Sequence, residues 1–136
     1  MYLFESLDTY NRAVRFAAMV EMTSRDFPPS TYYFVNRLNR FAESIFDQIA
    51  QAHSTWKEED RKNYFWRARA SIQECFGLIE IASRQGFISQ KLRDLYRYEL
   101  DELNKEIQDL IRAPMPSIKK VTMGETVLLE QNFSDN

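Results

Sequence analysis

The sequence contains few of the residues that break helices or build disulfide and metal sites. Its 136 residues include three Gly, four Pro, one Cys and one His. So few Gly and Pro favour long uninterrupted helices over a turn-rich β fold. The single cysteine, Cys75, excludes a disulfide within the chain and favours a reducing compartment. The glycines, at 77, 86 and 124, are scattered, which excludes a glycine-rich phosphate loop.

Long apolar runs and a secretory leader are also missing. No apolar stretch approaches the ~18 residues that a membrane span needs. The first residues, MYLFESLDTY, have neither a basic lead nor a long apolar core. The 18 basic and 20 acidic residues give a net charge of −2. We therefore expect a soluble cytoplasmic protein of one domain, able to bury its own core, with no membrane partner and no cofactor.

What the sequence does contain is a set of apolar stripes at helical spacing. The clearest lies within residues 33–52 and ends near His53. A first helix is predicted to begin at Ser6 or Asp8, after a loose lead-in at residues 1–5, and to end before Pro28. Four predicted stripes follow in chain order: Leu7, Tyr10, Val14, Ala17, Ala18 and Met22; Phe34, Leu38, Phe41, Ala42, Ile45, Ile49 and Ala52; Phe65, Ala68, Ile72, Cys75, Phe76, Ile79 and Ala82; Leu92, Leu95, Tyr96, Leu100, Leu103, Ile107, Leu110 and Ile111.

Capping residues mark the predicted helix ends. Ser30 or Thr31 can cap the second helix, and the acids at 58–60 suit the start of the third. Gly86 is a natural left-handed C-cap, and Ser89 can cap the fourth helix, which Pro114 stops. The predicted fold is all-α, an antiparallel up-down-up-down four-helix bundle over residues 1–113. The remaining residues, 114–136, are predicted to form an extended or disordered non-helical tail.

The residues that carry most catalytic chemistry lack partners in the sequence. His53 has no second His, Cys or carboxylate at metal-ligand spacing, so a helix-end or surface role is favoured. Cys75 falls in an apolar stripe, which is typical of a small core residue. The glutamates at 74, 80, 99, 102 and 106 resemble those of di-metal bundles, but none has a His three residues later. We expect these carboxylates to be solvated or paired with Arg, and we expect no enzyme activity.

A local excess of basic residues beside aromatic ones is the strongest functional signal. Residues 60–73 carry four basic residues and one acid, Asp60, with Tyr64, Phe65 and Trp66 among them. Arginine and aromatic side chains together can stack on bases. The candidate nucleic-acid-binding residues are Arg37, Arg40, Arg61, Lys62, Arg67 and Arg69. The alternative is a solvated helix face whose aromatics fill a bundle or subunit seam, and the pI of about 5.5 argues against strong nonspecific binding.

The order of several short motifs resembles one known family. The motifs are Tyr10-x-x-Ala13, Phe27-Pro28, Arg40-x-Ala42-x-Ser44-Ile45-x-x-x-Ile49-Ala50, Ala70-Ser71-Ile72-x-Glu74, Glu80-Ile81-Ala82 and Gly86-Phe87-Ile88-Ser89. Together they are similar to the four-helix-bundle family of 23S rRNA intervening-sequence proteins over residues 7–113. The family's Asn-Ile-Ala-Glu-Gly turn is replaced here by Gln48 to Ala52, and Asn39 stands where the family has a second Arg beside Arg40.

The resemblance implies a homo-oligomeric ring, a homopentamer, whose heterologous contacts join two different faces of each subunit. A related branch resembles the accessory variability proteins of diversity-generating retroelements, which bind a reverse transcriptase and nucleic acid. Two functions follow as expectations. The first is a non-enzymatic scaffold or adaptor that binds RNA, DNA or a nucleoprotein. The alternative is a protein-interaction accessory subunit of a partner enzyme such as a reverse transcriptase.

Overall fold

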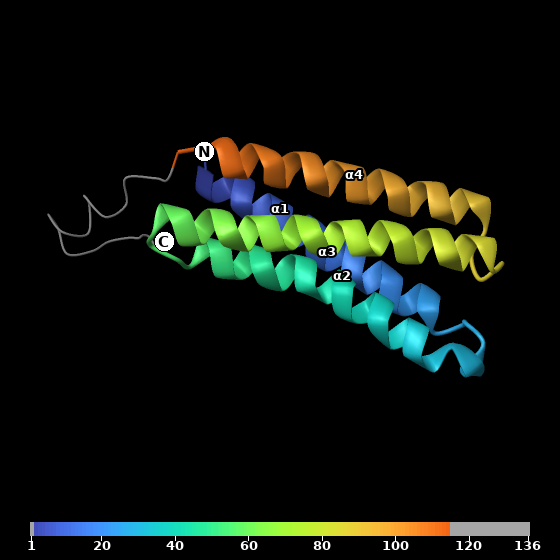
Figure 1. The fold of residues 1–136 in the computed structure, drawn as a ribbon. Coiled ribbons are helices and arrows are strands. Elements are labelled where there is room, and N and C mark those ends of the chain that lie inside the picture. The colour runs from blue at the N-terminus through green and yellow to red at the C-terminus, as the bar shows by residue number, and fades with distance from the viewer. Residues whose placement is uncertain (1, 115–136) are drawn as a thin grey trace, which may run out of the picture.

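Four helices run in alternating directions and pack side by side. The computed structural model describes the backbone of residues 2–114 and the side chains of residues 6–114. The elements are α1 (Tyr2–Ser24), the short 3-10 turn η1 (Pro29–Thr31), α2 (Tyr32–His53), α3 (Glu58–Arg84) and α4 (Gln90–Arg112). Each helix contacts the next, and α4 contacts α1, which closes the bundle. The start of α1 and the end of α4 therefore lie at the same end (Figure 1). The described residues form no strand, and the predicted all-α up-down-up-down fold is confirmed.

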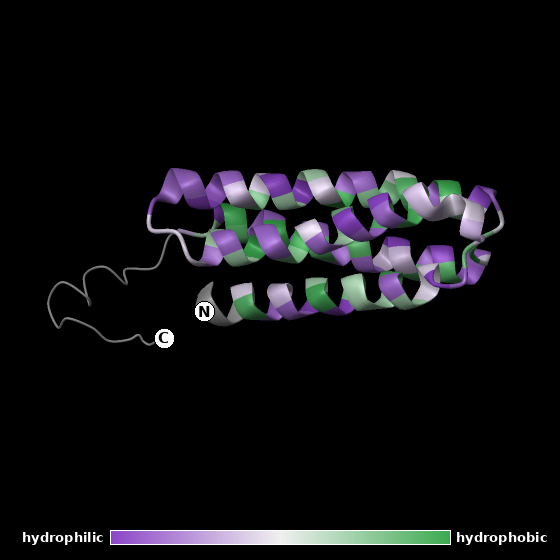
Figure 2. Cartoon of the chain, turned by 90° about the horizontal axis from the view of Figure 1, so that it is seen from below, coloured by the Kyte–Doolittle hydropathy of each residue, from purple (hydrophilic) through white to green (hydrophobic). Residues whose placement is uncertain are grey.

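The predicted apolar stripes of α2, α3 and α4 form the core. Leu38, Ile45, Phe65, Ile72 and Leu103 are each at most 1% exposed. Hydrophobic residues concentrate where the helices face one another, and hydrophilic residues dominate their outer sides (Figure 2). Leu95 is the exception, with 43% of its surface exposed. Successive helical residues point about 100° apart, and the neighbouring Tyr96 takes the core position instead.

The predicted stripe of α1 is rotated relative to the buried face, although one of its members, Ala17, is buried. Leu7, Val14 and Met22 are 49%, 36% and 65% exposed. The buried face of α1 consists of Ser6, Thr9, Ala13, Phe16, Ala17, Val20 and Ser24. Three of these residues are polar, and each has a partner on another helix: the Ser6 hydroxyl lies 3.1 Å from Nδ1 of His53, Thr9 donates to Glu106 at 3.0 Å, and the Ser24 hydroxyl accepts from Asn39 at 2.9 Å. A polar side chain with a hydrogen-bond partner can be buried at little cost.

Some helix ends follow the predicted chemistry and others do not. Gly86, at φ 79°, ends α3 as predicted, because Phe87 N donates to the Ala82 carbonyl and Gly86 N to the Ser83 carbonyl. The Ser89 hydroxyl accepts from Leu92 N and caps α4. At α2, however, Thr31 makes no capping bond, since its hydroxyl donates to the Pro28 carbonyl.

The chain also begins differently from the prediction. α1 starts at Tyr2, so the segment 1–5 predicted as a loose lead-in is helical from residue 2 onward, and neither Ser6 nor Asp8 begins the helix. No Gly or Pro occurs before Pro28 to stop the helix from extending toward the N-terminus. The predicted non-helical tail lies, after Pro114, outside the described residues.

Candidate nucleic-acid interface

The structure separates the predicted basic residues into three environments. Arg61 is buried, while the others lie along two different edges of α3. Arg67 and Arg69 are two positions apart, and residues at that spacing do not share a helix face. Arg67 follows the side of α3 that faces α2, because Glu74, seven residues and about two turns further on, pairs with Arg37 of α2. Arg69 follows the side that faces α4, where it contacts Asn104.

Arg61 is buried and has a structural role. Its side chain is 1% exposed, and its guanidinium donates to the carbonyl oxygens of Leu110 and Ala113 at 2.8 and 3.0 Å. It also pairs with Glu58 at 3.1 Å. These carbonyls belong to the end of α4, where a helix leaves acceptors without intrahelical donors. Arg61 therefore caps α4 from α3. This placement argues against its predicted contact with nucleic acid, and we leave it out of the interface.

The edge between α2 and α3 holds three of the predicted residues in ring contacts. The Arg37 and Arg40 guanidinium carbons lie 5.8 and 5.9 Å from the centre of the Phe41 ring, and Arg67 lies 5.1 Å from that of Tyr64. Arg37 is neutralised by Glu74 at 3.2 Å. This edge therefore keeps Arg40 and Arg67 as its exposed positive charges.

The edge between α3 and α4 combines fixed arginines with an exposed indole. Arg69 Nε donates to Asn104 Oδ1 at 3.0 Å, and its guanidinium carbon lies 4.9 Å from the centre of the Trp66 ring. Trp66 is 51% exposed. Lys62, one turn before Trp66, lies 3.5 Å from Glu58. Two contacts thus hold the Arg69 guanidinium in place beside an open aromatic surface.

A second group of arginines, which sequence reasoning missed, continues this edge. The Glu80 carboxylate pairs with Arg84 and Arg93 at 3.0 Å each and with Arg97 at 3.7 Å. Hydrogen bonds, that from Arg93 first, lower the pKa of Glu80 and keep it ionised. Arg97 also lies 5.3 Å from the centre of the Phe76 ring. The signal that could have revealed this group is the i, i+4 pair Arg93 and Arg97 on the helix predicted beside α3.

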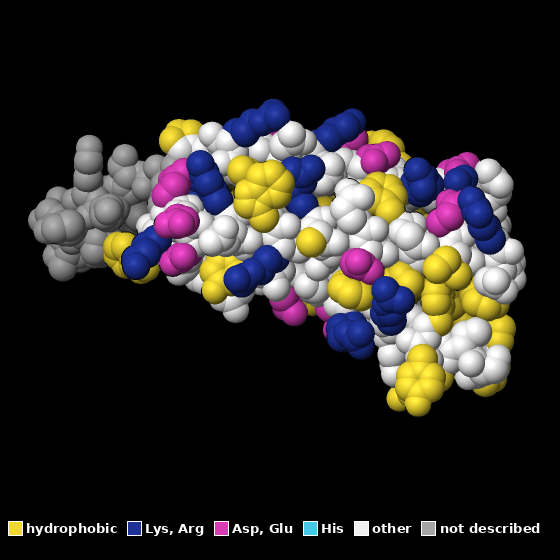
Figure 3. All heavy atoms as spheres, viewed as in Figure 1, with side chains coloured by type: hydrophobic (Ala, Val, Ile, Leu, Met, Phe, Trp, Pro, Cys, Tyr) yellow, Lys and Arg dark blue, Asp and Glu magenta, His cyan; other side chains and the backbone are white. Residues whose placement is uncertain are grey.

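Along this edge, which we call the α3–α4 face, basic residues outnumber the acids that pair with them. Its basic residues are Lys62, Arg69, Arg84, Arg93 and Arg97, and the acids that pair with them are Glu58, Glu80 and Asp94. Figure 3 shows Lys and Arg side chains along the length of the molecule in this view, with exposed hydrophobic side chains and some acids among them. The arrangement can attract phosphates and offer aromatic surface to bases.

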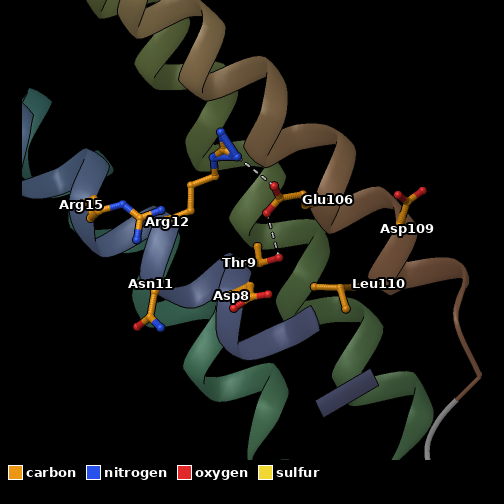
Figure 4. Close-up of a pocket in the computed structure, with 8 residues that line it drawn as sticks. All are labelled: Asp8, Thr9, Asn11, Arg12, Arg15, Glu106, Asp109 and Leu110. Carbon is orange, nitrogen blue, oxygen red and sulfur yellow. Dashed lines mark hydrogen bonds and ion pairs between the residues drawn. The ribbon is translucent and has the colours of Figure 1, made fainter. Parts of the chain in front are cut away.

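The opposite side of α4 forms a polar groove with α1. Arg12 pairs there with Glu106 at 3.0 Å, and Thr9 donates to the same Glu106 carboxylate (Figure 4). Arg12 also pairs with Glu99 at 3.2 Å. The open cavity measures about 490 Å³ and is lined by Asp8, Thr9, Asn11, Arg12, Arg15, Glu106, Asp109 and Leu110. Because two carboxylates occupy Arg12, this groove holds the helices together and has no cationic surplus for an anion.

The residues considered for catalysis are hydrogen-bonded, buried or ion-paired within the bundle. Partial burial lowers the pKa of His53, which favours the neutral ring, and its Nδ1 lies 3.1 Å from the Ser6 hydroxyl. Cys75 is 0% exposed, and desolvation raises the pKa of its thiol to about 12. The glutamates at 74, 80, 99, 102 and 106 all form ion pairs. Within the described residues no group of three or more His, Cys, Asp or Glu is placed to hold a metal ion.

The fold and surface define a four-helix bundle whose α3–α4 face combines arginines with aromatic rings. Residues 5–109 match the family of 23S rRNA-intervening sequence proteins, and the chain belongs to that family. The predicted resemblance is thereby confirmed. A comparison with curated proteins found no match. None of the described helices is both long and apolar enough to span a membrane.

A solved structure shows the same fold. The chain is similar to the crystal structure of a protein of unknown function from the S23 ribosomal protein family of Bacteroides thetaiotaomicron, with a TM-score of 0.74 and 16% sequence identity. The match covers 80% of this chain and 99% of that chain. At this identity the likeness establishes the bundle fold alone.

Proposed function

We propose that this protein is a non-enzymatic scaffold or adaptor that assembles into a homo-oligomer, a homopentamer, and binds RNA or a nucleoprotein in the cytoplasm. The observation that carries the proposal is the α3–α4 face, where basic residues outnumber the acids that pair with them and Trp66 is exposed. RNA is preferred over DNA as the nucleic acid because the chain belongs to a family named for rRNA inserts.

The side chains of this face suit a phosphate backbone. Asn104 and the Trp66 ring hold Arg69, and Phe76 and Glu80 hold Arg97. A guanidinium that is already ordered loses less side-chain entropy when it binds a phosphate oxygen. Arginine also presents a fixed fork of donors to phosphate. The face therefore offers positioned positive charges even though the whole chain has a net charge of −2.

Charge reversal tests the RNA interface. We expect Arg69→Glu/Arg97→Glu to weaken RNA binding about 100-fold, on the basis of about tenfold per lost phosphate contact. The salt dependence should also change, because the slope of log K against log salt falls by about 0.7 per contact with a single strand. The measurement is fluorescence anisotropy with a labelled RNA of roughly 20 nucleotides between about 50 and 200 mM salt.

The matched control reverses two arginines away from this face. Arg15 and Arg25 are exposed residues of α1 and of the loop that follows it, and Arg15→Glu/Arg25→Glu changes the net charge by the same amount. We expect the control to retain most of its affinity, with both variants keeping their helical circular dichroism. An equal loss in the two variants would show that binding follows net charge and not the α3–α4 face.

Exposed apolar residues on α1 support the oligomer. Leu7, Val14 and Met22 are 49%, 36% and 65% exposed, and they recur at about two-turn intervals, so they share one side of α1. Contiguous exposed apolar surface is typical of protein interfaces. We propose that this α1 strip contacts a different face of the neighbouring subunit, as a closed ring requires.

Native mass measurement tests the α1 strip. We expect Leu7→Glu/Val14→Glu to shift the assembly from oligomer to monomer, because each substitution places a charge in a desolvated contact. The control is Leu95→Glu, since Leu95 is 43% exposed on α4, outside the strip. Helicity should stay unchanged in both. An oligomer of the same mass in the double variant would remove the α1 strip from the interface.

A second candidate is an accessory subunit that binds a partner enzyme such as a reverse transcriptase. The observation that favours it is the aromatic pair at the start of α2, where Tyr32 and Tyr33 are 65% and 87% exposed. Exposed tyrosines are common at protein interfaces. The two candidates separate in one variant: an accessory subunit keeps its protein partner after Arg69 and Arg97 are reversed, and an RNA-dependent adaptor loses it.

A further inference from the structure

We propose that the α3–α4 face binds single-stranded RNA and that Trp66 stacks on an unpaired base. This inference rests on the proposed function and specifies its ligand. Trp66 is 51% exposed although it belongs to the middle of a well-packed helix. Half of this large aromatic side chain is covered within the monomer, and the other half remains open to water. A base stacked on the indole would cover its exposed surface.

Arg69 holds the Trp66 indole as a preorganised stacking surface. Its guanidinium carbon lies 4.9 Å from the ring centre, and Asn104 of the next helix fixes its Nε at 3.0 Å. The ring is therefore held from one side while half of its surface remains open. Stacking on such a surface is tolerant of base identity, because every base has a π face. The fixed guanidinium beside the ring is placed to receive the phosphate of the stacked nucleotide.

A second aromatic and arginine pair extends the platform. Arg97 lies 5.3 Å from the centre of the partly buried Phe76 ring. Phe76 follows Trp66 by ten residues on α3, a rise of about 15 Å. That length is enough to contact several nucleotides of a single strand. A short single strand can thus run along the face from Trp66 to Arg97.

Duplex RNA fits this face poorly. In an A-form helix the bases are already stacked on one another, and proteins read mainly its shape, its 2′-hydroxyls and its phosphates. Trp66 would have no base to meet, and only the basic side chains of the face would hold the duplex. Affinity for a single strand should therefore exceed affinity for a duplex, with the difference arising at Trp66.

Tryptophan fluorescence can report RNA binding at Trp66 directly. The chain has two tryptophans, Trp56 and Trp66, so Trp56→Phe leaves Trp66 as the sole indole fluorophore. The full-length variant is titrated with single-stranded oligouridine of roughly 10 nucleotides and with an RNA duplex of the same length. We expect oligouridine to quench Trp66 emission. Trp66→Ala should weaken oligouridine binding by roughly tenfold while leaving duplex affinity unchanged. Trp66→Phe should recover part of the loss.

The alternative outcomes are distinguishable. RNA binding with unaltered Trp66 emission, or with full affinity in Trp66→Ala, overturns the stacking proposal and leaves the RNA-binding function standing. A lower native mass of Trp66→Ala without RNA assigns the ring to a subunit seam and also overturns the proposal. Absence of binding to either RNA removes the proposal together with the RNA-binding function.

Discussion

Arg61→Met is expected to lower the free energy of unfolding by about 2–3 kcal/mol. Arg61 donates to the carbonyls of Leu110 and Ala113 from a side chain that is 1% exposed. Methionine fills much of the volume but donates no hydrogen bond, so the carbonyls at the end of α4 lose their donor. The last turn of α4 should then fray. Urea unfolding followed by circular dichroism measures the loss, and hydrogen exchange locates the fraying.

Arg67→Met is the matched control for this experiment. Arg67 belongs to the same helix but is exposed, and its described contact is the Tyr64 ring at 5.1 Å. The same chemical change should therefore alter stability by only about 0.5 kcal/mol. If the two variants were equally stable, the interior contacts of Arg61 would contribute nothing measurable, and its role as the α4 cap would be wrong.

The fold was predictable where local signals and burial agree. On α2 the apolar residues recur every three or four positions, and the same residues, such as Leu38 and Ile49, are buried. Gly86 and Ser89 end one helix and begin the next through bonds to nearby backbone, so residue type alone indicated their roles. On α1 the buried stripe includes Ser6 and Thr9, whose partners come from other helices. A periodicity that counts only apolar residues could not include them.

The candidate site was less predictable because it depends on which helices are neighbours. Arg61 lies in the apolar register of α3, four residues before Phe65. Because arginine is charged, the sequence predicted that it contacts nucleic acid. Only the end of α4 explains why it can be buried. The Glu80 group likewise joins α3 to α4 through residues 13 or more positions apart in the sequence, Glu80 with Arg93 and Arg97. Spacing within α4 shows that Arg93 and Arg97 share one side of the helix, but it does not show which residue of α3 they meet.

The charged residues of α4 are distributed unevenly around the helix. Arg93 and Arg97 lie on its α3 side, where they pair with Glu80. Glu99 and Glu106 lie on its α1 side, where they pair with Arg12. The two sides of one helix thus differ in sign, and the net charge of −2 averages over them. The electrostatic potential at a surface and the steering of a charged ligand depend on the local distribution of charge. The overall pI of about 5.5 therefore does not argue against RNA binding at the α3–α4 face.

The same burial that makes Cys75 unreactive is expected to make the protein sensitive to alkali. Desolvation raises the pKa of the Cys75 thiol from 9.0 to about 12. Below pH 9 the thiol is protonated in both the folded and the unfolded chain, and its full contribution to stability is present. As pH rises from 9 to 12, the unfolded chain ionises first, so stability falls. A pKa difference of this size corresponds to a loss of about 4 kcal/mol.

Cys75→Ala isolates this effect from every other group that titrates in alkali. Tyr96 acts in the same direction, because burial raises the pKa of its hydroxyl too, and it is present in both proteins. Removing the thiol leaves a small cavity, so the variant should be less stable than the wild type near neutral pH by about 1 kcal/mol. Its stability should then fall less steeply, and the two curves should converge or cross in alkali. Urea unfolding from about pH 8 to about pH 11 measures both curves, and parallel curves would mean that the thiol is not desolvated in the folded protein.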